Sequence, residues 1–196
     1  KGIKHSIHKE GSKFLGRKIH TPELIFTIFR AGSKLGTDGS DEGGCNGVGV
    51  KLTVVHSDSV NLQTVYKNKI YKQNYSMDLD KKELNVEPPV IEEYEGESFT
   101  QLDFLPHYKR FGYTSPPNKD DTKEIIDIIR YRLFHLATFL SFKKVKITFN
   151  DEVISVKNSL DLLNLVEQNE PAIKYPVIKT KGDKDKFNEY AVAVRS

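Results

Sequence analysis

The chain has 196 residues, long enough for one large domain or for one domain and the start of a second. Hydrophobic residues make up 37% of it and charged residues 29%, as in proteins with an apolar core, and the net charge of +3 permits a nucleic-acid partner without requiring one. No apolar run approaches the ~20 residues of a membrane span, and the single cysteine, Cys45, excludes an internal disulfide and a cysteine zinc cluster.

The first part of the chain is predicted to contain two helices. Residues 1–20 are expected to form a loop, and a helix over 21–30 follows, with Thr21 as its N-cap and an apolar stripe at helical spacing. Residues 34–42 are polar and contain glycine, which is typical of a surface loop or of a lid that orders over a ligand. A second helix is predicted over 47–56, so two helices flank this polar segment.

The middle of the chain alternates apolar and polar residues, which is the pattern of half-buried strands. Two such runs, 59–66 and 69–75, are separated by Lys67-Asn68 and predict a hairpin. Residues 78–89 are charged and are expected to form a connector. The other predicted elements are strands over 90–94 and 100–106, a long helix from a capping box at Asp121–Glu124 to Leu140, a strand turn over 145–156, a short helix over 159–167 and a strand over 187–195.

The stretch 41–52 carries three spaced glycines, Gly44, Gly47 and Gly49, as an apolar run begins. Residues without Cβ let an anion approach main-chain N–H groups, and a helix that begins there adds the positive end of its dipole. Lys51 supports this reading, because a cation in a first helical turn is unfavourable unless an anion is bound nearby. The spacing matches neither a Walker A loop nor G-x-G-x-x-G. It predicts a phosphate-binding loop, with a flexible turn before a core helix as the alternative.

Several landmarks follow one another along nearly the whole chain: Thr21–Phe26, Ala31–Lys34, Gly43–Leu52, Gly96–Pro106 and Arg110–Gly112. In this order they resemble the ATPase domain of type II DNA topoisomerases, in the GHKL (Bergerat-fold) superfamily. The resemblance implies an α+β fold, a two-layer α/β sandwich with a mixed, mostly antiparallel sheet and helices on one face. Residues 1–170 would form the ATPase domain, incomplete at its N-terminus, and residues 171–196 a linker and the first strand of a transducer domain.

The resemblance also implies an ATP site in three parts. The phosphate-binding part would consist of Gly44, Cys45, Asn46, Gly47, Val48, Gly49, Val50 and Lys51. The ATP lid and the contacts to sugar and phosphate would come from Ala31, Gly32, Ser33 and Lys34, and the adenine pocket from Gly2, Ile3 and Thr100. The family's general-base Glu and its magnesium-binding Asn would precede Lys1. We therefore expect no catalytic or metal-binding residue in this chain, and no ATP hydrolysis by the chain alone.

The implied function is that of the ATP-binding and ATP-hydrolysing gate of a type II DNA topoisomerase, which drives ATP-dependent strand passage. ATP and Mg²⁺ would be its cofactors, and its partners would be DNA and a second copy of the protein, with no membrane. Its location would be intracellular, in nucleus or cytoplasm.

Two alternatives remain open. Another GHKL ATPase, of the mismatch-repair type, would share the glycine loop but lack Arg110–Gly112. A non-catalytic interaction module would use the loop only as a turn. Glu10 and Glu23 are the acidic residues nearest the proposed site, but neither lies in a catalytic motif, so both are expected to be solvated rather than to act as a base.

Overall fold

The computed structural model describes residues 2–29, 47–114, 116–140, 145–156, 158 and 161–162, together with four short strands between residues 173 and 194. The chain divides into two compact units, Lys1–Pro116 and Pro117–Ser196, which we call the first and the second unit and describe separately. None of the described helices is long and apolar enough to cross a membrane.

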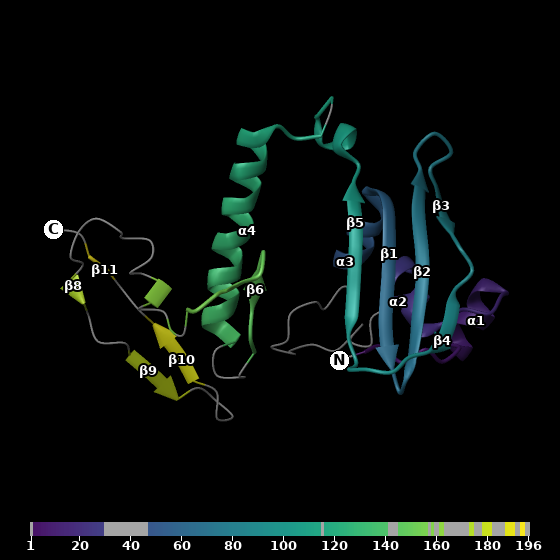
Figure 1. Ribbon diagram of the computed structural model, residues 1–196, viewed down its shortest axis with the longest axis horizontal. Helices are drawn as coiled ribbons and strands as arrows, with labels where there is room; N and C mark the ends of the chain where they lie inside the picture. Colours follow the sequence, from purple (N-terminus) through teal and green to yellow (C-terminus); the bar gives the residue numbers. More distant parts are fainter. Residues whose placement is uncertain are drawn as a thin grey trace. The chain divides into compact units, whose positions relative to one another are not determined.

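The centre of the first unit is a five-stranded sheet (Figure 1). Its order is β3 (Glu83–Val86), β2 (Lys69–Asp78), β1 (Ser57–Tyr66) and β5 (Thr100–Pro106), and β4 (Val90–Glu93) pairs with a second part of β2. All pairings among these described strands are antiparallel, as expected for a mostly antiparallel sheet. The short strand β3 was not predicted, because it lies inside the charged segment 78–89.

The central hairpin confirms the prediction for residues 59–75. Lys67 and Asn68 join β1 to β2, and both have positive φ angles, 50° and 59°. Two such residues form a turn whose twist matches that of the strands beside it. The pairs Tyr66↔Lys69 and Val65↔Ile70 therefore close the hairpin without a bulge.

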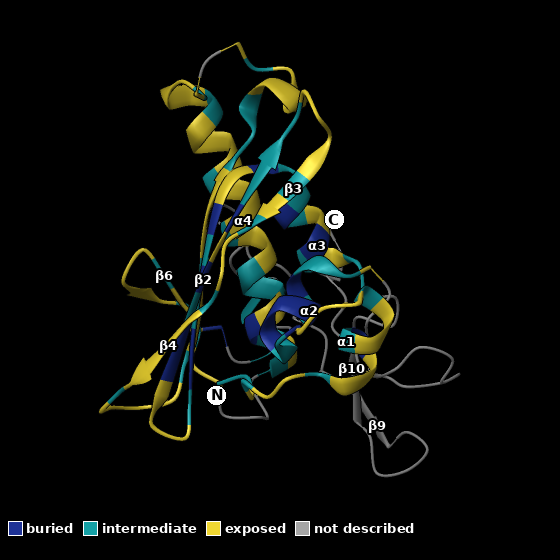
Figure 2. Ribbon diagram, turned by 90° about the vertical axis from the view of Figure 1, so that its right-hand side faces the viewer, coloured by how far each residue is buried: buried dark blue, intermediate teal, exposed yellow. Residues whose placement is uncertain are grey.

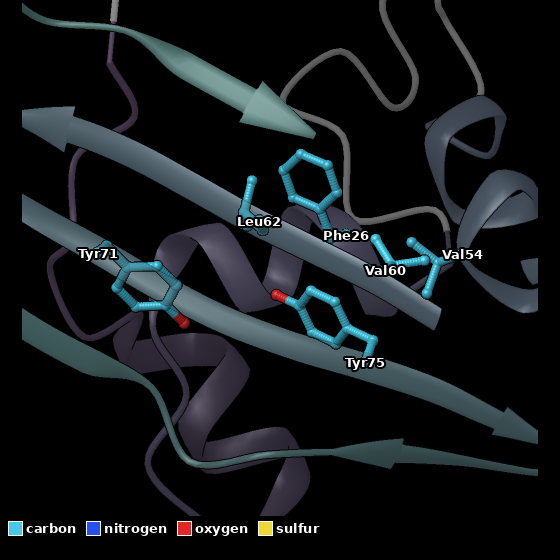
Figure 3. Close-up of a cluster of buried hydrophobic side chains, with 6 residues drawn as sticks. All are labelled: Phe26, Val54, Val60, Leu62, Tyr71 and Tyr75. Carbon is cyan, nitrogen blue, oxygen red and sulfur yellow. The ribbon is translucent and has the colours of Figure 1, made fainter. Parts of the chain in front are cut away.

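Three helices lie on the same side of this sheet (Figure 2). They are α1 (Lys9–Leu15), α2 (Thr21–Thr27) and α3 (Gly49–Val55). Figure 3 shows the core that α2 and α3 form with the sheet; its buried members are Phe26, Val54, Val60, Leu62, Tyr71 and Tyr75. The opposite face of β1 and β2 carries mostly polar side chains, with Asn61 Nδ2 donating to Asn74 Oδ1 at 2.6 Å, but it also holds the buried pair Val65 and Ile70 beside the hairpin turn. The difference between a largely apolar and a largely polar face explains why the sequence alternates with period two.

Helix α1 was not predicted, since residues 1–20 were expected to be a loop. Its N-cap is His8, whose Nδ1 accepts a hydrogen bond from Gly11 N at 3.0 Å, and Gly16 ends it in the left-handed region at φ 65°. Histidine is not among the preferred N-cap residues, and a glycine inside the helix weakens its propensity. Packing compensates, because Gly11 is buried against Leu24 and Ile19.

Two predicted helix caps are wrong in detail. The N-cap of α2 is His20, and Thr21 is the first helical residue, with its Oγ1 donating to Ser6 O at 3.0 Å. In the second unit, α4 (Lys119–Leu140) begins two residues before Asp121, so Asp121 is not the start of a capping box. Asn118 instead accepts hydrogen bonds at Oδ1 from the N–H groups of Asp120 (2.8 Å) and Asp121 (2.9 Å).

The rest of the second unit consists of short strand pairs. The predicted strand turn is present as β6 (Thr148–Phe149) and β7 (Glu152–Val153), joined by Asn150 and Asp151 with positive φ. The other strands are β8 (Ile173–Lys174), β9 (Ile178–Lys181), β10 (Phe187–Tyr190) and β11 (Ala193–Val194), with β9 paired to β10 and β8 to β11. Of the predicted helix over 159–167, only Asp161 and Leu162 are described, and they are helical.

A single residue, His56, separates helix α3 from strand β1. The short helix η1 (Tyr108–Phe111), which follows β5, holds this junction. Arg110 Nη1 donates to Val55 O at 3.0 Å, and His107 N donates to His56 O at 2.9 Å. These bonds satisfy carbonyl groups that the end of α3 leaves without a helical partner, and they place a positive charge at the negative end of its dipole.

Candidate functional site

The described part of the predicted phosphate loop lies at the N-terminus of α3. Gly47 has φ 57°, in the left-handed region that favours glycine. Gly49 is exposed and is the first residue of α3, and a Cβ added there would meet no described atom within 4 Å. The first N–H groups of a helix have no partner within the helix. The backbone at Gly49 is therefore accessible at the point where the unpaired N–H groups of the first helical turn begin.

Lys51 brings a positive charge to the same turn. It is only 2% exposed, and its Nζ donates a hydrogen bond to Gly47 O at 2.6 Å. Burial lowers the pKa of Lys51. A cation is disfavoured here by desolvation and by the positive end of the helix dipole. An anion at the loop would offset both effects, so the electrostatics of this turn favour a negatively charged ligand.

The three residues predicted for the adenine pocket come together at strand β1. The main chain of Gly2 lies so close to β1 that a Cβ would be 1.6 Å from Val65 O. Ile3 N donates to Thr64 Oγ1 at 2.8 Å, and Thr100 Oγ1 of β5 lies 2.8 Å from the same atom. Segments far apart in the sequence therefore meet at the Thr64 hydroxyl, which is fully buried.

Two histidines hold the segment that carries Gly2 and Ile3. His5 Nε2 lies 3.1 Å from Thr64 O, and His20 Nδ1 lies 2.7 Å from His5 O. Both rings pack against Tyr71, at centroid distances of 5.5 and 5.7 Å. Burial lowers the pKa of His5, with a smaller opposing contribution from its hydrogen bond to Thr64 and a further lowering by His20. The neutral form of His5 is therefore favoured in the folded protein.

Glu23 differs from its expected place on a solvated face. It is 2% exposed, and its Oε1 accepts a hydrogen bond from Arg17 Nη2 at 2.5 Å. Glu10 is exposed, as expected. The Arg17–Glu23 pair ties the segment after α1 to helix α2, which gives Glu23 a structural role.

Some of the predicted site residues lie outside the described residues. They are Ala31, Gly32, Ser33, Lys34, Gly44, Cys45 and Asn46. Thr64 was not predicted to be a site residue. Its signal in the sequence is a polar residue at an inward position of strand β1, where the two preceding inward residues, Val60 and Leu62, are apolar. Within the described ranges, no three His, Cys, Asp or Glu side chains gather as ligands of a metal ion would.

Comparison with known proteins places these features in a family context. No family model matches the chain. The chain is 30% identical over 165 residues to DNA topoisomerase 2 of African swine fever virus, a match that covers 84% of this chain and 13% of that protein. It is also 30% identical over 167 residues to DNA topoisomerase 2 of Arabidopsis thaliana, covering 84% and 10%. The chain is related to the ATPase region of type II DNA topoisomerases.

Solved structures agree with this relationship. The ATPase region of Saccharomyces cerevisiae topoisomerase II bound to dexrazoxane superposes with a TM-score of 0.71 at 25% identity, covering 91% of this chain and 45% of that one. These comparisons confirm the resemblance inferred from the sequence and the predicted GHKL fold class. The chain spans 13% of the length of the viral topoisomerase, so it corresponds to a small part of such an enzyme.

Proposed function

We propose that this chain is the nucleotide-binding part of the ATP-operated gate of a type II DNA topoisomerase. The observation that carries the proposal is the open backbone at Gly49 beside the buried cation of Lys51, in a fold related to topoisomerase ATPase regions. None of the described residues packs so closely against Gly49 that a side chain there would be excluded. Burial also disfavours the positive charge of Lys51. A bound triphosphate gives both features a function.

The residues of the loop fit a triphosphate in charge and in hydrogen-bonding character. N–H groups of Gly47, Val48 and Gly49 would donate to phosphate oxygens, and Lys51 would balance their charge. ATP with Mg²⁺, when bound, supplies phosphoryl transfer to water. We assign the rest of the loop to Gly44, Cys45, Asn46 and Val50, the lid to Ala31, Gly32, Ser33 and Lys34, and the adenine pocket to Gly2, Ile3 and Thr100.

The proposed role of the whole protein follows from its relatives, which are named DNA topoisomerase 2. Its partners would be DNA and a second copy of the protein, and its location intracellular. Residues 1–170 would belong to the ATPase domain and residues 171–196 to the start of the transducer domain. ATP bound at the loop would favour closure of two copies around a DNA segment.

Substitution of Gly49 by Ala tests the proposal. The added methyl group meets no described atom and suits a helix, so the thermal unfolding midpoint should stay the same or rise slightly. The same methyl group would stand where phosphate approaches, and the affinity for ATP should fall by about tenfold or more. Equilibrium binding of a fluorescent ATP analogue to the intact protein, with Mg²⁺, measures this effect.

Thr53→Ala is the control for an alanine substitution in helix α3 outside the loop. It should bind ATP as the unchanged protein does. Equal ATP affinity in Gly49→Ala and the unchanged protein would contradict a phosphate site at this loop. Failure of the unchanged protein to bind ATP would contradict the proposed function and favour the non-catalytic interaction module.

A further inference from the structure

The excess positive charge of the chain is concentrated in its first twenty residues. They contain six lysine or arginine residues and one glutamate, a net charge of +5, whereas the whole chain carries +3. Three of these lysines, Lys9, Lys13 and Lys18, are exposed and form no ion pair with another described residue. On the sheet, by contrast, Lys72 is paired with Glu92 at 2.7 Å. The positive charge around α1 is therefore available to an anion from outside the chain.

The three lysines lie on α1 and on the segment that returns beside it. Lys9 and Lys13 are one turn apart in α1, so their Cβ atoms are about 6 Å apart on the same side of the helix. Ile19 O accepts a hydrogen bond from His8 N at 2.8 Å, so the segment that carries Lys18 runs back beside the start of α1. The outer side of this helix is exposed (Figure 2). Three positive charges are thus gathered on one part of the surface.

An exposed aromatic ring accompanies these charges. Phe14, in the last turn of α1, is 83% exposed, the largest exposed fraction of any large apolar side chain among the described residues. One exposed apolar residue is common on protein surfaces and needs no explanation by itself. Its place among lysines without ion-pair partners is the distinguishing feature, because surfaces that bind single strands of nucleic acid combine cations with aromatic rings.

A single strand fits this surface better than a membrane or a duplex. A helix that lies on a membrane buries a whole apolar face, whereas α1 has seven residues and, apart from Phe14, turns its non-polar positions Gly11 and Leu15 at least partly toward the protein. A duplex offers phosphates to the lysines but keeps its bases stacked on one another. A single strand offers both phosphates and unpaired bases, and so gives a partner to the lysines and to the ring.

We propose that α1 and the segment after it bind single-stranded nucleic acid, with Lys9, Lys13 and Lys18 at phosphate groups and Phe14 stacked on a base. The inference goes beyond the proposed ATP site and does not depend on it. Lysines that neutralise phosphates release counterions, so their contribution to affinity falls as salt is added. Stacking on Phe14 involves no charge of the protein. A salt titration therefore separates the two contributions.

Fluorescence anisotropy of a labelled oligothymidylate of about 15 nucleotides measures binding to the intact protein. Joint substitution Lys9→Gln and Lys13→Gln should lower the affinity by about tenfold at low salt. It should also reduce the slope of log affinity against log salt by about 1.4, because two phosphate contacts are lost. Phe14→Leu should lower the affinity by about fivefold or more without changing the slope, and Phe14→Tyr should bind as the unchanged protein does, since it keeps the ring.

The matched control is the joint substitution Lys82→Gln and Lys109→Gln, which removes two exposed charges of the first unit outside this surface. It should change the affinity by less than about twofold. An equal loss in the control would mean general attraction between charges and would overturn the inference, as would unchanged binding by Phe14→Leu or a duplex bound as tightly as the single strand. Binding to phosphatidylserine vesicles in place of the oligonucleotide would assign the surface to a membrane instead.

ATP binding by the same proteins separates this inference from the proposed function. The variants at Lys9, Lys13 and Phe14 should bind ATP as the unchanged protein does, because these side chains lie outside the proposed site. An unchanged protein that binds the oligonucleotide but no ATP would refute the proposed function alone. One that binds ATP but no oligonucleotide would refute this inference alone.

Discussion

The two ends of the proposed nucleotide site use glycine for opposite reasons. At the base end, Gly2 has no room for a side chain, since a Cβ would lie 1.6 Å from Val65 O. At the phosphate end, a Cβ on Gly49 would meet no described atom within 4 Å. Gly2 is therefore required by the packing of the protein, whereas none of the described residues requires the absence of a side chain at Gly49. A glycine that packing does not require is the more informative sign of a ligand.

The polar groups of the two ends differ in the same way. At the base end, the Thr64 hydroxyl has hydrogen-bond partners within the protein for its hydrogen and its lone pairs. At the phosphate end, Lys51 holds a buried positive charge against the carbonyl of Gly47, and burial lowers its pKa. The base end is thus stable by itself, and the phosphate end gains most from a bound anion. Three substitutions test this difference.

Gly2→Ala should have the largest effect on stability. The added methyl group collides with main-chain atoms of β1, which cannot move without disturbing the sheet. We expect the free energy of unfolding in urea to fall by about 3 kcal/mol, the upper part of the range for overpacked sites. Gly49→Ala, the same change at the other end, should leave it almost unchanged. Similar losses in the two variants would remove the contrast between the ends.

Lys51→Met should separate stability from binding. Methionine keeps an unbranched apolar chain and removes a charge that burial disfavours, so the free energy of unfolding should stay the same or rise by up to about 1 kcal/mol. The ATP affinity should fall by about tenfold, because one charge opposite the phosphates is lost. Calorimetric titration with ATP measures the second effect. A destabilised variant that still binds ATP normally would show that Lys51 serves packing.

His5→Gln should have the smallest effect on the free energy of unfolding. This effect should be seen only when the pH is lowered. Folding lowers the pKa of His5 below its ordinary value of 6.5. At a pH between the lowered pKa of the folded protein and 6.5, the unfolded chain therefore binds a proton at His5 more readily than the folded protein does. Stability from this group is complete above about pH 6.5 and is lost as the pH falls toward the folded pKa. Glutamine retains an N–H donor for Thr64 O but does not titrate. The decrease in unfolding free energy between pH 7.5 and pH 5.5 should therefore be smaller in the variant, and an equal decrease would contradict the neutral state of His5.

Much of the fold was predictable because its signals are local. The turn at Lys67-Asn68 and the alternation of Val60 and Leu62 identify the central hairpin without any long-range information. Helix α1 was missed because its stability comes from a histidine cap and from the contact of Gly11 with Leu24, which no local pattern reveals. The caps of α2 and α4 were misplaced by one to three residues, since several polar residues in a row can each serve as a cap.

The candidate site divides along the same line. The loop at Gly47, Gly49 and Lys51 could be predicted because its chemistry lies in one short stretch. Thr64 could not be assigned a role in this way, because its partners Ile3 and Thr100 are distant in the sequence and meet it only in the folded sheet. Glu23 was expected to be solvated because its partner, Arg17, lies on a segment that was read as a loop.

Because α3 leads directly into β1, the distance between the two ends of the proposed site is constrained. Only His56 separates the helix that begins at the predicted phosphate loop from the strand that carries Thr64. Arg110 stabilises this junction by donating a hydrogen bond to Val55 O. The separation of the two ends is thereby set by covalent bonds along one continuous segment. If the proposed site is correct, a nucleotide that spans the two ends would have to match this fixed length of backbone.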